Sequence, residues 1–165
     1  MKDKHGYEQH RFEIFDSVDI VHTTKDGKLS KQSGEDLITN AGMAGVAAII
    51  LTDVGGTAFD YVAIGSGTNA PLVADTTLTA ELARKAATGS RSTTSVANDT
   101  AQWVVTFTDA DTGCDGTQSI AEIGILNASS NGTLLLHQTF TPENMIWSNG
   151  DTLNCTIKVQ IKQGA

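Results

Sequence analysis

Hydrophobic and polar residues alternate along several stretches of this chain, and a period of two is the pattern of a half-buried β-strand. In the stretch 12–22, Phe12, Ile14, Val18 and Ile20 fall on one face and mostly polar residues fall on the other. The stretch 152–162 has the most regular alternation in the chain. We therefore predict one long strand near each end of the sequence.

More strands are predicted between these two, and glycine-containing turns separate them. Residues 59–64, 102–108 and 120–125 are rich in β-branched and aromatic residues. Asn131-Gly132 predicts a hairpin between 123–128 and 134–140, and Asp26-Gly27 predicts a tight turn of type I′.

Two segments have the spacing of helices instead. Residues 33–51 place apolar side chains at steps of three and four, and Ser33 is positioned to cap this predicted main helix. Residues 75–86 predict a short helix, with Leu78 and Leu82 one turn apart. The resulting fold class is mainly β: a β-sandwich or jelly-roll-like domain over residues 12–165, preceded by a polar N-terminal arm over residues 1–11.

Charge and composition exclude several functions. The 165 residues include 11 Lys and Arg against 19 Asp and Glu, which gives a net charge of −8. An acidic chain is poorly suited to nucleic acid, because phosphate binding needs basic side chains. No apolar run reaches the 18 residues or so that a membrane span requires. The polar N-terminus also lacks the apolar stretch of a secretory signal, so we expect synthesis in the cytoplasm.

The residue types that catalysis uses do not form a recognisable motif. Of the four histidines, His5 and His10 lie in the arm, while His22 and His137 lie in strand patterns without a nearby nucleophile motif. Gly65-x-Gly67 lacks the third glycine of a nucleotide-binding loop. Cys114 and Cys155 are more consistent with free thiols than with a disulfide, although two cysteines leave both open. We expect a protein that is not an enzyme and that needs no cofactor.

Two weaker sites remain as candidates. Asp109, Asp111 and Asp115 alternate along a loop and could offer oxygen ligands to Ca²⁺, although the loop only partly matches an EF-hand; the alternative is a solvated acidic turn. Trp147 lies in a predicted loop and is a candidate for an exposed contact with a partner or a sugar ring; the alternative is a loop that caps the sandwich.

Several short motifs together resemble small structural proteins of tailed bacteriophages. The resemblance covers about residues 37–162 and rests on these segments: Asn40-Ala-Gly-Met, Phe59 to Pro71, Asp75-Thr-Thr-Leu, Glu81-Leu-Ala-Arg84, Trp103 to Thr108, Ile120 to Asn127, Gly132-Thr-Leu-Leu-Leu and Gly150-Asp-Thr-Leu153. The first 30 residues lie outside the pattern.

This resemblance implies a non-enzymatic virion component. Capsid decoration (cement) proteins fit the size best; they are β-sandwich or jelly-roll domains, often trimeric, that bind the outside of the shell. The implied partner is a major capsid protein, in a homo-oligomer for which a trimer is favoured, on the capsid exterior of a virion assembled in the host cytoplasm. Phe12 and Ile14 are then candidate partner-binding residues. The alternatives are a tail, baseplate or fibre-associated adaptor, or a receptor-binding or carbohydrate-binding β-domain.

Overall fold

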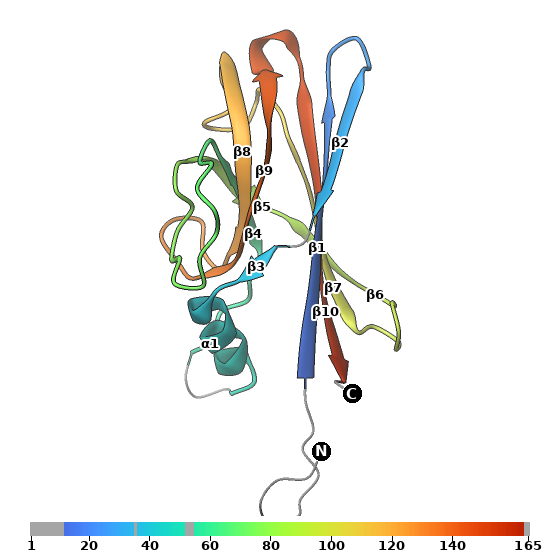
Figure 1. Cartoon of the computed structure of the whole chain (residues 1–165), viewed down its shortest axis with the longest axis vertical. Helices are drawn as coiled ribbons and strands as arrows, with labels where there is room; N and C mark the ends of the chain where they lie inside the picture. The colour runs from blue at the N-terminus through green and yellow to red at the C-terminus, as the bar shows by residue number, and fades with distance from the viewer. Residues whose placement is uncertain (1–11, 35, 52–54, 164–165) are drawn as a thin grey trace, which may run out of the picture.

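Two five-stranded antiparallel sheets pack face to face in the computed structural model, which describes residues 12–34, 36–51 and 55–163 (Figure 1). The first sheet has the order β2 (Leu29–Gly34), β1 (Phe12–Thr23), β10 (Thr152–Gln163), β7 (Thr100–Phe107) and β6 (Thr88–Ser92). The second has the order β3 (Leu37–Ile38), β9 (Leu134–Ile146), β8 (Thr117–Leu126), β4 (Tyr61–Gly65) and β5 (Glu81–Ala86). The predicted β-sandwich is thereby confirmed. The predicted arm, residues 1–11, lies outside the described residues.

The alternating stretches form the strands that were expected of them. β1 and β10 pair along their whole length, from Phe12 opposite Gln163 to Thr23 opposite Thr152. The inward residues of β10 and β7 are buried, and they meet the apolar run of β8 in one core that spans both sheets. Burial of this shared face is the main contribution that holds the two layers together.

The predicted hairpin at Asn131-Gly132 is confirmed, and it joins β8 to β9. Both residues have the left-handed backbone that this turn signal favours, with φ of 52° and 82°. The predicted type I′ turn at Asp26-Gly27 is wrong in type, because Gly27 alone in that turn has a positive φ. The Gly27 N–H instead donates to the carbonyl of Thr24 at 2.8 Å in the β1–β2 loop, residues 24–28.

The predicted helix over 33–51 is much shorter in the structure. α1 spans Asn40–Ile49, and its cap is Thr39, whose hydroxyl accepts the N–H of Gly42 at 2.9 Å. Ser33 lies in β2, which pairs with β1. Residues 33 and 34 pair with β1, residues 37 and 38 pair with the distant strand β9, and this pairing overrides the local helical spacing.

The predicted short helix over 75–86 is wrong. Residues 81–86 form the edge strand β5, which pairs with β4, and residues 75–80 form turns and a loop. Leu78 is buried in a small cluster with Ala63, Leu126 and Leu134. The spacing of Leu78 and Leu82 therefore reflects two separate contacts rather than one helical face.

Two further points follow from the described residues. Cys114 and Cys155 are both buried, free thiols. Among the helices that the structure describes, none has the length and apolar character needed to cross a membrane.

Candidate functional site

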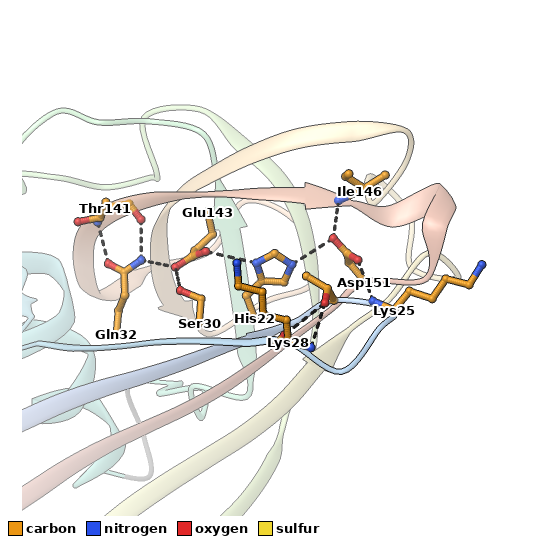
Figure 2. Close-up of polar contacts among 10 residues, drawn as sticks. His22, Lys25, Lys28, Ser30, Gln32, Thr141, Glu143, Ile146 and Asp151 are labelled. Atoms are coloured by element: carbon orange, nitrogen blue, oxygen red, sulfur yellow. Dashed lines mark hydrogen bonds and ion pairs between the residues drawn. The ribbon is translucent and has the colours of Figure 1, made fainter.

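His22, at the end of β1, lies between two carboxylates (Figure 2). Its Nδ1 is 3.3 Å from Oε2 of Glu143 on β9, and its Nε2 is 3.1 Å from Oδ2 of Asp151, just before β10. Because ionised carboxylates only accept hydrogen bonds, each ring nitrogen of His22 faces an acceptor. The cluster joins the first sheet to β9 of the second sheet.

Neighbouring groups complete this polar network. Ser30 and Gln32 on β2 donate to Oε1 of Glu143, each at 2.6 Å, and the backbone N–H groups of Lys25 and Ile146 donate to Asp151 (Figure 2). Burial tends to raise the pKa of Asp151, but the N–H of Ile146 and the His22 ring hold it below its usual range. The carboxylates therefore stay ionised, and the network ties the sandwich together at this end.

A second buried histidine repeats the arrangement within the other sheet. His137 on β9 has its Nδ1 2.8 Å from Oδ2 of Asp75 and its Nε2 3.0 Å from Oε2 of Glu122 on β8. Glu122 is fully buried, and its carboxylate also accepts the backbone N–H groups of Gly67, Thr79 and Ala80 at 2.7–3.0 Å. This cluster therefore holds both ends of the loop between β4 and β5 against β8 and β9.

The glycine-rich loop after β4 is therefore built around a carboxylate of the protein itself. A side chain at Gly67 would place a Cβ 2.6 Å from Oε1 of Glu122, and one at Gly65 would place it 2.4 Å from the same atom. Glycine permits this close approach. The Gly67 N–H is already bonded to Glu122, so it is not free to bind a phosphate.

The carboxyl groups of Asp36 and Asp16 lie close together near the start of β3. The N–H of Asp36 donates to Oδ1 of Asp16 at 3.2 Å, and both carboxyl oxygens of Asp36 are shielded from solvent. Burial, together with the adjacent Asp16 carboxylate, raises the pKa of Asp36 to about 9. At neutral pH Asp36 is therefore a neutral acid.

An apolar cleft opens between the two sheets on the side of α1. It encloses about 300 Å³, and among the residues that the structure describes, Asp60 is the one ionisable residue in its lining. Ile14 of β1 and Ile161 of β10, which are paired neighbours, form one wall, while Val46 and Ile49 of α1 contribute to the lining. Ile14, Ile49 and Ile161 are 38%, 47% and 50% exposed, so the rim of the cleft is apolar and open to solvent.

The calcium candidates are not brought together. Asp109 and Asp115 are exposed, whereas the carboxylate of Asp111 lies 2.6 Å from Nζ of Lys85 and accepts the N–H of Thr108. Among the residues that the structure describes, no three His, Cys, Asp or Glu side chains lie close enough to hold a metal ion. The loop is therefore an acidic turn in which Lys85 pairs with Asp111.

The prediction that Trp147 is an exposed contact is wrong. Trp147 is fully buried in the short 3₁₀ helix η1 (Trp147–Asn149), and its Nε1 donates to Gln118 at 2.7 Å. It caps the core, the alternative considered above. Of the other partner-binding candidates, Ile14 lies on the rim of the apolar cleft, and Phe12 pairs with Gln163 at the start of β1.

The sequence motifs did not identify the buried polar residues, although two signals pointed to them. His22 continues the inward face of β1, two residues after Ile20, so the alternation already placed it inside. Glu122 interrupts an apolar run, and a buried charge needs partners. Those partners come from distant segments, which local spacing does not reveal.

Both ring nitrogens of His22 and of His137 lie within hydrogen-bonding distance of carboxylates of the same chain, so both side chains are held inside the fold. Comparison with family models, with curated proteins and with solved structures found no match to this chain.

Proposed function

We propose that this chain is a non-enzymatic structural component of a tailed-phage virion, and specifically a decoration protein that binds the outer shell formed by the major capsid protein. The resemblance of its motifs to such proteins is the starting point. The contacts of Glu122 carry the proposal further, because they connect those motifs in space.

Three of the resembling segments form neighbouring strands. Residues 59–71 contain β4, residues 81–84 lie in β5, and residues 120–127 contain most of β8, in the order β8-β4-β5. Glu122 of the third segment binds the N–H of Gly67 in the first and reaches Thr79 and Ala80 just before the second. The motifs thus form one physical unit, which supports treating them as the signature of a single kind of domain.

The hydrogen bonds of the buried ionisable residues are consistent with a rigid structural protein. The buried ionisable residues His22, His137, Glu122 and Asp151 make hydrogen bonds to other strands and loops of the same chain. Such a domain can act by repeated weak contacts, since each additional contact on a shell is made at high effective concentration. Burial of Trp147 removes the aromatic side chain that the sugar-binding alternative offered for contact with a sugar ring.

Electron microscopy of particles from a phage that encodes the chain tests the proposal. We expect density for the two-layer sandwich at local symmetry axes over the outer shell. Density at the tail vertex alone would favour the tail, baseplate or fibre adaptor instead. Absence of the chain from purified particles would reject both virion functions.

Shell binding by the purified protein tests whether the polar arm, residues 1–11, contributes to the shell contact. Co-sedimentation with assembled shells is expected for the full chain and is expected to weaken when residues 1–11 are deleted. If the deletion leaves co-sedimentation unchanged, the shell contact lies in the sandwich and the arm has no part in it.

A further inference from the structure

We propose that Asp16, Asp36 and Gln138 form a binding site for Ca²⁺. The site lies between the two sheets, where β2 of the first sheet is followed by β3 of the second (Figure 1). The inference is independent of the proposed function, because it rests on the positions and contacts of these three side chains alone.

The register of the first sheet brings Asp36 next to Asp16. The β1–β2 ladder ends with Val18 opposite Gly34, and two further steps along the same register put Asp16 opposite Asp36. The N–H of Asp36 accordingly donates to Oδ1 of Asp16 at 3.2 Å. Asp16 continues the inward face of β1, two residues before the buried Val18. Since directly opposite residues share a face, both carboxyl groups lie on the inner side of this sheet.

The register of the second sheet brings Gln138 to the same place. Leu37 pairs with His137, so one further step puts Gln138 opposite Asp36. Gln138 also pairs with Ile123, which belongs to the core between the sheets, so the Gln138 side chain lies on the inward face of β9. Asp36 and Gln138 line the same hollow beside β3. Two carboxyl groups and one amide therefore meet between the layers.

The oxygen atoms of two of these side chains are buried without a donor. Among the residues that the structure describes, the buried side-chain polar atoms that have no hydrogen-bond partner are both carboxyl oxygens of Asp36 and Oε1 of Gln138. Gln138 is only 7% exposed. All of these atoms are acceptors, so the partner that suits them is a hydrogen-bond donor or a cation.

A basic side chain is not the partner among the described residues. The lysine and arginine ion pairs in the part of the chain that the structure describes join Arg84 to Glu81 and Lys85 to Asp111, away from this site. The proton that Asp36 holds as a neutral acid serves one acceptor and leaves the remaining oxygens without a partner.

Ca²⁺ suits the whole set of oxygens. It binds about six to eight oxygens, taken from carboxylates, Asn or Gln side chains, backbone carbonyls and water. One ion could contact both carboxylates and Oε1 of Gln138, and its charge would balance the two carboxylates. The neutral acid form of Asp36 is then the ion-free form of the same site.

The ligand set also indicates how tightly the ion binds. Two of the three ligands are carboxylates and the third is an amide, which is why the site is not one of the groups of three or more His, Cys, Asp or Glu side chains that the described residues lack. Water would fill the other coordination positions. Few charged ligands give weak binding, so we expect a dissociation constant of about 0.1–1 mM.

Calorimetric titration of the full chain with Ca²⁺, after treatment with a chelator, tests the inference at pH 8. Asp36→Asn and Asp16→Asn each remove one charge and keep the side-chain shape, and each should raise the dissociation constant at least about 10-fold. Gln138→Met removes the amide oxygen and should raise it at least about 3-fold. Asp109→Asn is the matched control: Asp109 is an exposed residue of the acidic turn, and its replacement should leave the dissociation constant unchanged.

Urea denaturation gives an independent result if a variant binds poorly because it folds poorly. Ca²⁺ should raise the unfolding midpoint of the original chain and of Asp109→Asn, but not that of Asp36→Asn. The absence of binding up to about 10 mM Ca²⁺ overturns the inference, since the proton and solvent would then suffice for these oxygens. Binding that Asp109→Asn abolishes and Asp36→Asn leaves intact also overturns it, because the ion would then lie in the acidic turn.

Discussion

Glu122 is a charged side chain in a stretch of β8 that is otherwise apolar and buried, and its contacts explain how it is accommodated. Oε1 accepts the N–H groups of Gly67 and Ala80, while Oε2 accepts the N–H of Thr79 and faces His137. The carboxylate is thus surrounded by donors, which compensates for the loss of hydration.

Replacing Glu122 with Gln keeps the shape of the side chain but should destabilise the protein. An NH₂ group in place of Oε1 faces the N–H groups of Gly67 and Ala80, and one in place of Oε2 faces the N–H of Thr79, so in either orientation at least one donor loses its acceptor. We expect the free energy of unfolding in urea to fall by about 2–4 kcal/mol. Glu13→Gln, on the outer face of β1, is the control and should change it by less than about 0.5 kcal/mol. Equal effects of the two substitutions would contradict the part assigned to the Glu122 contacts.

At the scale of elements, α1 lies close against β9 because it has glycine where it meets that strand. A Cβ at Gly42 would lie 2.3 Å from the carbonyl oxygen of Leu135, and one at Gly45 would lie 2.6 Å from the ring of Phe59. These glycines cost intrinsic helix stability, and close packing on the sheet offsets that cost.

Gly42→Ala therefore separates helix propensity from packing. Propensity alone predicts a gain of about 1 kcal/mol, but the clash with the β9 backbone should produce a net loss of about 1–3 kcal/mol, measured by chemical denaturation. Gly89→Ala is the matched control, since a Cβ there meets nothing within 4 Å and should cost no stability. A stabilised Gly42→Ala variant would show that α1 is free to move away from β9.

Elements whose faces alternate regularly could be predicted from the sequence, and those with short-range helical spacing could not. β1, β7 and β10 were predicted because one face of each strand is buried along most of its length. Residues 33–38 and 81–86 were assigned to helices, yet each pairs with a strand that local spacing does not indicate, as in Val18 opposite Gly34.

At the scale of the whole molecule, the histidine clusters depend on contacts between distant parts of the chain. His22 and Asp151 are 129 residues apart, so the sequence could predict the burial of His22 by alternation but not its partners. The apolar cleft likewise combines β1, α1, β7 and β10. Its lining comes from both sheets and from α1, a combination that no single segment encodes.

Five carboxyl groups that are wholly or partly shielded from solvent change the stability of the fold in two opposite directions as the pH changes. Burial tends to raise the pKa of Asp75, Asp111, Glu143 and Asp151, but hydrogen bonds to each of them hold the pKa below its usual range. The stability that they add is present above about pH 4 and is lost as the pH falls further. Asp36 acts in the other direction, because its pKa is raised from 3.8 to about 9 and folding requires it to hold a proton that the unfolded chain releases.

We therefore expect stability to be greatest on the acid side of neutrality, and Asp36→Asn to test the cause. Asparagine mimics the neutral acid without needing a proton. The free energy of unfolding of the variant should increasingly exceed that of the original chain between about pH 4 and pH 9, by up to about 1.4 kcal/mol for each pH unit. Urea denaturation across this range measures the difference. A difference that does not change with pH would mean that Asp36 is ionised in the folded protein, and that its carboxylate is stabilised despite its burial beside Asp16.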